Sequence, residues 1–216
     1  MRFRVQRRVA LERMRTRIAT DLHDDIGASL SQIAILSEVA VHGIPDEAAA
    51  TRDTLAGIAA TSRELVESMS DIVWAINPKH ERLNDLVRRM RRFAIDLFAE
   101  GSIDHEFRAP PEEEDVQLNA ELRRQLYLVF KECLHNMVRH SRAQRAASEL
   151  KMRGSWLELT VSDDGCGFDP ADTSHQGHGL RSIRDRAKRL GGEVKVDSSP
   201  GTGTRIIFRA PLRQVF

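Results

Sequence analysis

The stretch TDLHDDIGASLSQ, residues 20–32, places one histidine, His23, among three aspartates on a segment with helical periodicity. Leu22 and Ile26 are four residues apart, so they share one face of a helix. At about 100° per residue, His23 lies beside this apolar stripe rather than inside it. We therefore predict that His23 stands on a rigid helix within reach of another molecule. Taken alone, a histidine in such a place is more often structural or simply exposed.

Helical periodicity extends on both sides of this stretch and predicts a first domain over residues 1–100, made of two long helices. Apolar residues recur at steps of three and four from about residue 3 to 41, and again from residue 46 onward. A glycine and a proline predict a loop near 42–46. Pro78 predicts either one helix with a kink or two nearly collinear helices.

Two long helices joined by a short loop predict an antiparallel hairpin. A single hairpin cannot cover both of its apolar stripes. Two copies paired into a four-helix bundle cover them, so we predict a homodimer.

The sequence changes character after Gly101, and residues 101–216 are predicted to form a separate α+β domain. Alternating apolar and polar residues predict strands, and apolar steps of three and four predict helices. The expected strands are 103–109, 145–152, 156–162, 193–197 and 205–210, and the expected helices are 119–140 and 179–190.

Four polar clusters in this second domain together predict a nucleotide site. Glu132 and Asn136 project from one helix face, and their oxygens suit a magnesium ion that keeps several waters. Glycines after Asp163 let the backbone approach a ligand closely. Residues 177–180 enter a helix N-terminus, where free amides favour phosphate. The fourth cluster, residues 201–204, leads into the last strand. Each cluster alone is a weak signal, and the prediction rests on their order and spacing.

Composition excludes several classes of protein and site. The 216 residues carry a formal net charge of +1, so no global field attracts nucleic acid, and we predict no direct nucleic-acid partner. Cys133 and Cys166 lie in unrelated settings, which argues against a metal site or a disulfide framework. No apolar run approaches the ~20 residues that span a bilayer, and no signal peptide is visible.

The N-terminus is rich in arginine up to residue 17, which indicates either a solvated helix face or a cytoplasmic juxtamembrane segment. The chain begins within a helical pattern and without a capping signal. We therefore expect that an upstream part is missing from it.

These motifs resemble those of a bacterial two-component sensor histidine kinase, and the resemblance covers nearly the whole chain. Residues 17–27, RIATDLHDDIG, resemble the phosphoacceptor signature of the subfamily whose partners are response regulators with a helix-turn-helix output domain. Residues 132–140 (ECLHNMVRH), 163–167, 177–180 and 201–204 resemble the N, G1, G2 and last glycine boxes of the ATP-binding domain shared with gyrase, Hsp90 and MutL.

The resemblance implies a dimeric four-helix bundle followed by an α/β-sandwich of the Bergerat type. It implies a protein-histidine kinase that uses ATP and Mg²⁺ to phosphorylate His23 and passes the phosphoryl group to an aspartate of a response regulator receiver domain. Asp24 is expected to orient the imidazole or accept its proton. The resemblance also implies the cytoplasmic domain of a membrane-anchored bacterial protein, with its sensor part upstream.

The same resemblance implies roles for residues of the second domain. Asn136, supported by Glu132, is expected to bind magnesium. Asp163 is expected to accept the adenine amino group in a pocket shaped by Gly165 and Gly167. The other expected ATP-binding residues are Gly177, Gly179, Leu180 and Thr204, together with Arg139 and His140, which either touch phosphates or are ordinary surface charge.

Two positions depart from the family pattern. Ala28 stands five residues after the phosphoacceptor, where many relatives carry a glutamine that orients water, so we predict weak or absent phosphatase activity toward the regulator. Ser29 and Gln32 are the nearest residues that could substitute. His135 stands where an asparagine is more usual, and the sequence assigns it no role.

Two other functions remain open at this point. One is a serine-phosphorylating or energy-transducing ATPase of the same superfamily, which leaves residues 17–27 unexplained. The other is a dimeric scaffold that binds ATP without transferring phosphate.

Overall fold

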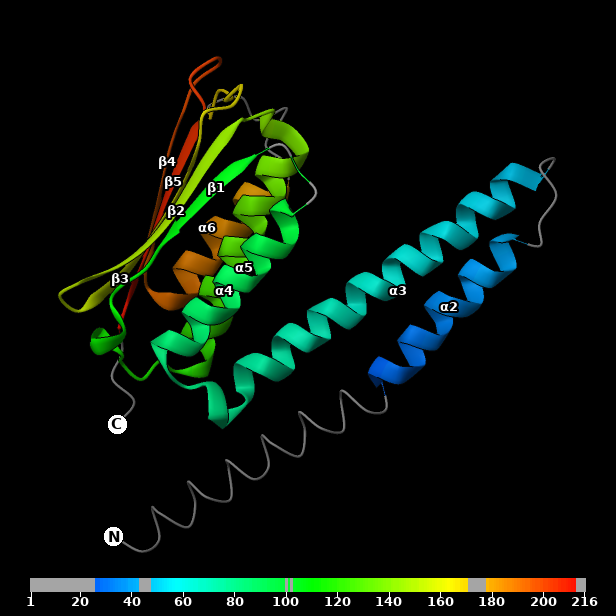
Figure 1. Ribbon diagram of the computed structural model, residues 1–216, viewed down its shortest axis with the longest axis horizontal. Helices are drawn as coiled ribbons and strands as arrows, with labels where there is room; N and C mark the ends of the chain where they lie inside the picture. Colours follow the sequence, from blue (N-terminus) through cyan, green and yellow to red (C-terminus); the bar gives the residue numbers. More distant parts are fainter. Residues whose placement is uncertain (1–25, 43–47, 100, 102, 171–177, 213–216) are drawn as a thin grey trace, which may run out of the picture. The chain divides into compact units, whose positions relative to one another are not determined.

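A computed structural model describes residues 26–42, 48–99, 101, 103–170 and 178–212 of the chain (Figure 1). The chain divides into two compact units, Met1–His80 and Glu81–Phe216. Among the described residues, no helix combines the length and the apolar character that crossing a bilayer requires.

The first unit contains two helices, α2 (Ala28–His42) and α3 (Ala49–Ile76), which lie side by side as an antiparallel hairpin (Figure 1). This confirms the predicted hairpin, and the loop expected near 42–46 lies almost wholly outside the described residues. The short 3₁₀ helix η3 (Pro78–His80) follows α3.

The chain leaves α3 just before Pro78, where Asn77 takes an extended conformation. A residue before proline is disfavoured in the helical region, because the proline ring clashes with its backbone. The next helix begins only at Leu83. Of the two alternatives at Pro78, the single kinked helix is therefore wrong, and two separate helices are present.

Small side chains form the contact between the two helices of the hairpin. Ala34 and Ser37 of α2 and Ala59 and Ser62 of α3 are buried. Several large apolar residues of the predicted stripes are exposed in the single chain: Ile26 just before α2, Ile33 and Leu36 on α2, and Ile58 and Leu65 on α3. The hairpin thus closes through its small residues and leaves its large ones uncovered.

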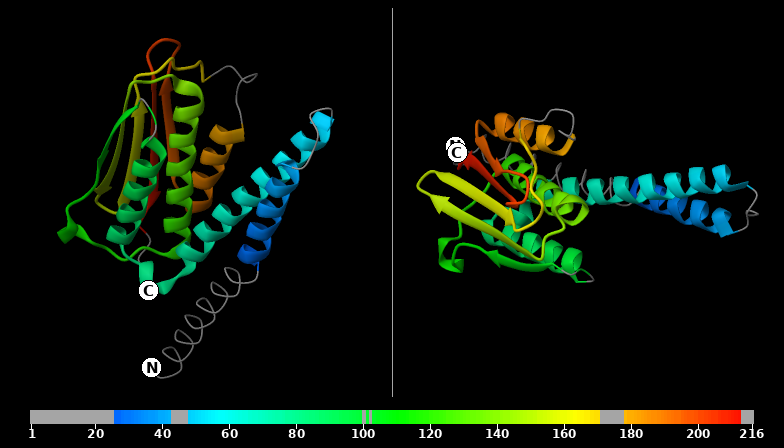
Figure 2. Two further views of the ribbon diagram at one scale, coloured as in Figure 1. Left: turned by 45° about the vertical axis from the view of Figure 1, so that its right-hand side comes forward. Right: turned by 90° about the horizontal axis from the view of Figure 1, so that it is seen from above.

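The second unit is a five-stranded sheet with helices on one face, which confirms the expected α+β architecture (Figure 2). The strands run in the order β1-β2-β3-β5-β4, parallel between β1 and β2 and antiparallel elsewhere. Their bounds are β1 Asp104–Arg108, β2 Arg145–Arg153, β3 Trp156–Asp163, β4 Glu193–Ser198 and β5 Thr204–Pro211. The helices are α4 Leu83–Phe98, α5 Ala120–Asn136 and α6 His178–Leu190, with a short 3₁₀ helix, η4, at Glu112–Glu114.

Helix α4 belongs to this second unit. Leu83, Leu86 and Met90 are no more than 1% exposed, and α4 packs against α5 and β1. The backbone N–H of Leu83 also donates to the carbonyl of Val116. The compact unit therefore begins at residue 81 rather than at the expected boundary of 101. The apolar repeat runs in phase through Pro78, so the sequence pattern did not indicate a domain boundary near this proline.

The core of the second unit lies between the sheet and its helices. Alternate residues of the central strands, such as Leu159 on β3 and Phe208 on β5, are buried, as are Phe130 of α5 and Ile183 of α6. The intervening strand positions form a polar face, where Arg209 pairs with both Glu158 and Glu193. A ligand cavity in this unit therefore belongs at an end of the helix–sheet interface.

Candidate functional site

A cavity of about 420 Å³ lies where β3 ends, β5 begins, α5 ends and α6 begins. These four chain ends carry the four polar clusters that the sequence singled out. Seven predicted site residues line the cavity: Asn136, His140, Asp163, Gly167, Gly179, Leu180 and Thr204.

Asp163, the last residue of β3, places a partly buried carboxylate at one side of this cavity. Burial raises the pKa of Asp163, and the neighbouring charge of Asp164 acts in the same direction. The backbone amides of Gly165 and Thr204 donate to the carboxylate and oppose this rise. The result is a hydrogen-bond acceptor held in a fixed orientation with limited access to water.

The loop after Asp163 packs directly against neighbouring backbone. A Cβ on Gly165 would lie 2.2 Å from the carbonyl oxygen of Ser141, and a Cβ on Gly167 would lie 2.1 Å from that of Ser199. Asp164 anchors the same loop, since its Oδ1 accepts the N–H groups of Gln144 and Arg145, each at 2.9 Å. Glycine at 165 and 167 thus lets this loop pack against neighbouring backbone, whereas the sequence predicted a close approach to a ligand. Gly167 lines the cavity, and Gly165 does not.

Glu132 and Asn136 meet the N-terminus of α6 at another side of the cavity. The side-chain nitrogen of Asn136 donates to Oε1 of Glu132 at 3.1 Å, which leaves the amide oxygen of Asn136 available. A Cβ on Gly179 would lie 2.2 Å from that Oε1, so any side chain at this position would displace the carboxylate. Two hard oxygen donors and the first amides of a helix therefore converge, as a magnesium-bound phosphate requires.

The floor of the cavity is apolar, and the sequence analysis did not select its residues. Met137, Val161, Phe168 and Ile206 line it together with the thiol of Cys133, whose pKa burial raises to about 12. A signal was available for two of them. Val161 and Ile206 each lie two strand positions from a predicted site residue, so they face the same side of the sheet.

Five predicted or unusual positions lie away from this cavity or outside the described residues. Arg139 is exposed and does not line the cavity, which favours ordinary surface charge. The ring of His135 packs edge-on against Phe93 of α4, with centroids 5.4 Å apart, so the residue belongs to the α4–α5 contact. His23, Asp24 and Gly177 lie outside the described residues.

Two family models match the chain, one in each half. Residues 15–81 match the model described as histidine kinase (HisKA_3). Residues 121–214 match the model described as histidine kinase-, DNA gyrase B-, and HSP90-like ATPase (HATPase_c).

Curated relatives match across both halves. The sensor histidine kinase LiaS of Bacillus subtilis is 25% identical over 198 residues, which is 92% of this chain and 54% of that protein. The sensor histidine kinase DesK of the same organism is 30% identical over 202 residues, 92% of this chain and 51% of that protein. The chain spans about half the length of these relatives.

Solved structures share the fold. The histidine kinase domain of the blue-light activated histidine kinase of Erythrobacter litoralis has a TM-score of 0.53 at 23% identity and covers 86% of this chain and 96% of its own. The histidine kinase AdeS of Acinetobacter baumannii has a TM-score of 0.56 at 15% identity, and the match covers 87% of this chain and 96% of the AdeS chain. Because one of these models matches each half and the same relatives extend across both, the chain contains the kinase core of a bacterial sensor histidine kinase.

Proposed function

We propose that this chain uses ATP to phosphorylate its own His23 and then passes the phosphoryl group to an aspartate of a response regulator. The observation that carries the proposal is the cavity of the second unit, which joins acceptors for a base at Asp163 with donors for phosphate at the start of α6. The match of residues 15–81, which include His23, to a histidine kinase model supports His23 as the phosphoryl acceptor.

At the end of the cavity that holds the base, the carboxylate of Asp163 accepts a hydrogen bond from the exocyclic amino group of adenine. Its carboxylate is already oriented by the N–H of Gly165 at 2.9 Å, so it needs no rearrangement when the nucleotide binds. The apolar floor at Met137, Val161 and Ile206 covers the face of the ring. A purine with a carbonyl in place of the amino group would bind less well, because its carbonyl oxygen and the Asp163 carboxylate are both hydrogen-bond acceptors.

At the phosphate end, the first amides of α6 donate hydrogen bonds to the triphosphate. Asn136 and Glu132 would hold the magnesium ion, which neutralises phosphate charge when it is bound. The absence of a side chain at Gly179 keeps this corner open. Phosphoryl transfer depends mainly on such positioning and charge neutralisation.

In the transfer itself, a ring nitrogen of His23 forms a bond to the γ-phosphorus while the bond from that phosphorus to the bridging oxygen breaks. ADP leaves with the bonding electron pair. Asp24 orients the imidazole or accepts its proton, so that the attacking nitrogen keeps a lone pair.

The exposed stripe of the hairpin supports a homodimer. Ile33, Leu36 and Val39 of α2 are 43%, 59% and 63% exposed, and Leu65 of α3 is 49% exposed. Contiguous large apolar residues on a soluble surface mark an interaction site. A second hairpin would bury them in the core of a four-helix bundle.

Two narrower proposals follow from the resemblance. We place the chain on the cytoplasmic side of a membrane-anchored sensor, since arginines crowd the segment before residue 18. We also propose weak or absent phosphatase activity toward the regulator, because the methyl group of Ala28, exposed at the start of α2, cannot orient a water molecule.

The chemical stability of the phosphorylated protein tests this function against its rivals. After incubation with γ-labelled ATP and magnesium, phosphohistidine is lost in acid and survives base. A label that survives acid would indicate phosphoserine and contradict the proposal. ATP binding without any label would favour a scaffold.

A further inference from the structure

We propose that Ser198 is a positioning residue of the nucleotide site: its hydroxyl holds Phe168 and Thr204 where they line the cavity and orients the Thr204 hydroxyl as an acceptor. The inference rests on the proposed binding of ATP in this cavity. Ser198 ends β4 and stands directly opposite Thr204 of β5 in the sheet register. It does not line the cavity itself.

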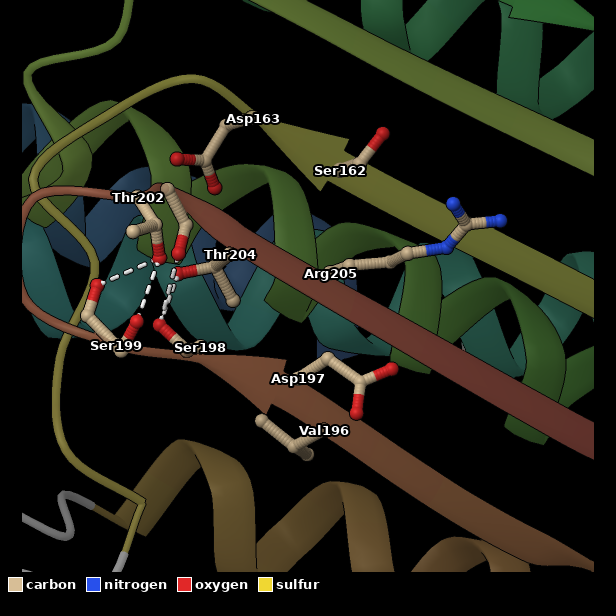
Figure 3. A pocket seen from close by; sticks show the side chains of 10 residues that line it. Ser162, Asp163, Val196, Asp197, Ser198, Ser199, Thr202, Thr204 and Arg205 are labelled. Atoms are coloured by element: carbon tan, nitrogen blue, oxygen red, sulfur yellow. Dashed lines mark hydrogen bonds between the residues drawn. The ribbon is translucent and has the colours of Figure 1, made fainter.

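The Ser198 hydroxyl links its own strand, β4, to two other backbone segments, and Figure 3 shows it beside Thr204. It accepts the backbone N–H of Phe168 at 3.0 Å and donates to the carbonyl of Gly203 at 2.9 Å. The hydroxyl oxygen of Thr204 lies 3.1 Å away. A hydroxyl has one hydrogen and two lone pairs. With its hydrogen on Gly203, Ser198 therefore accepts from both Phe168 and Thr204, and its bonding capacity is filled.

This arrangement fixes the polarity of the Thr204 hydroxyl. Since its hydrogen is directed at Ser198, Thr204 offers only lone pairs to a ligand in the cavity. Asp163, whose carboxylate accepts the Thr204 backbone amide, is likewise an acceptor. Two acceptors on one wall select a ligand that brings an amino group, as adenine does, over one that brings a carbonyl.

Close backbone packing and a hydrogen bond from the N–H of Gly201 to the carbonyl of Cys166, at 2.7 Å, also hold these segments together. Gly167 and Gly203 have φ of +58° and +76°, and a Cβ on either would lie 2.1 Å from a backbone oxygen. The other hydroxyls of the turn bond within the turn: Ser199 with Thr202 at 2.8 Å, and Thr202 with the Ser199 carbonyl at 3.0 Å. The hydroxyl of Ser199 therefore bonds within the turn and not to Phe168 or Thr204.

Two variants of equal shape isolate the hydroxyl. Ser198→Thr and Ser198→Val add the same branch at Cβ, which suits a strand, and only threonine keeps the hydroxyl. Ser198 borders an open hollow of about 550 Å³, which gives the added methyl room. Comparing the two variants therefore removes the hydrogen bonds without changing the packing.

The measurement is the affinity of the full-length chain for ATP and for ITP, which carries a carbonyl where ATP carries the amino group. Ser198→Thr should bind ATP like the unaltered protein. Ser198→Val should bind ATP about three- to tenfold more weakly, which corresponds to the loss of one net hydrogen bond. The affinity of Ser198→Val for ITP should fall less, so the ratio of its ATP affinity to its ITP affinity should be smaller than in the unaltered protein. Thermal unfolding of both variants is followed in parallel.

A purely structural role would lower the unfolding temperature and weaken ATP and ITP binding alike, and that result would overturn the proposal. Equal ATP affinity in Ser198→Val and Ser198→Thr would also overturn it. Ser199→Ala is the control, and it should change neither affinity nor preference. An equal loss in that variant would assign the effect to the turn as a whole and reject Ser198 as the positioning residue.

These readouts separate this inference from the proposed kinase activity. If the chain binds ATP but does not phosphorylate His23, the proposed function fails, and the comparison of threonine with valine still decides the role of Ser198. If the chain binds no ATP, both fail.

Discussion

At the level of single residues, the ionised carboxylate of Asp163 lowers the stability of the fold and strengthens nucleotide binding. Burial raises its pKa, so the folded chain takes up a proton more readily than the unfolded chain does. Asp163 therefore reduces stability progressively as pH rises from the ordinary carboxyl range through its raised pKa. ATP binding has the opposite dependence, because a protonated Asp163 loses its acceptor character toward the adenine amino group.

Asp163→Asn should therefore weaken ATP binding and, at neutral pH, raise the free energy of unfolding. ATP affinity of the unaltered protein should fall as pH drops through the raised pKa. Asp164→Asn is the matched control, because hydrogen bonds from the amides of Arg145 and Gln144 lower the pKa of Asp164. That change should reduce stability at neutral pH. Nucleotide titrations and denaturant unfolding across the acidic-to-neutral range measure both effects, and a destabilised Asp163→Asn would contradict the interpretation.

Two glycines of the site should respond differently to alanine. In Gly179→Ala the new Cβ meets the flexible ends of Glu132 and Asn136, so the fold survives while these side chains move and ATP affinity in magnesium falls. In Gly203→Ala the Cβ meets the Asp163 carbonyl at a φ of +76°, and such strain costs about 1–3 kcal/mol or more. Thermal unfolding beside nucleotide titration distinguishes them. An unfolded Gly179→Ala, or a Gly203→Ala of normal stability, would be inconsistent with this geometry.

At the level of elements, the decisive feature is helix α4. It supplies Leu86 and Met90, both 0% exposed, to the second unit. A fragment of residues 81–216 should therefore fold and bind ATP, whereas residues 101–216 should expose the α5 surface and fail to fold cooperatively. Circular dichroism melting and ATP titration of the two fragments provide the test. A stable, ATP-binding 101–216 fragment would show that α4 is dispensable.

The sequence predicted the elements whose residues alternate or repeat cleanly. The strands β1 to β5, the helix α6 and the start of α5 appear within about two residues of their expected positions, in line with the usual uncertainty of boundaries. The unit boundary was missed because α3 and α4 keep one apolar phase across Pro78. The end of α5 was also missed, since a π-helical turn at Met137–Ser141 and a left-handed Arg142, φ 54°, depend on the loop that packs there.

The site was predictable where chemistry marks a residue, as at Asp163 and Asn136, and not where packing alone does so. Met137 and Phe168 line the cavity, but nothing in their sequence setting distinguishes them from other core residues. Ser198 was missed for the same reason, because its role depends on which strands become neighbours.

At the level of the whole molecule, the uncovered stripe of α2 predicts assembly. Leu36→Lys places a charge at a position that is 59% exposed in the single chain but buried in the proposed bundle. We expect the protein to shift from dimer to monomer, because an unpaired charge in an apolar interface is costly. Glu64→Lys, at an exposed and already charged position of α3, is the control. Light scattering gives the mass of each, and a dimer that tolerates Leu36→Lys would place the interface elsewhere.

The central claim is that the nucleotide bound by the second unit phosphorylates His23 on the first. The most direct measurement is label uptake from γ-labelled ATP by the protein and by its His23→Gln variant, each saturated with ATP. We predict equal ATP affinity for the two, with acid-labile label on the unaltered protein and none on His23→Gln. Label that persists on His23→Gln would show that another residue is the acceptor, and would contradict this account of the protein.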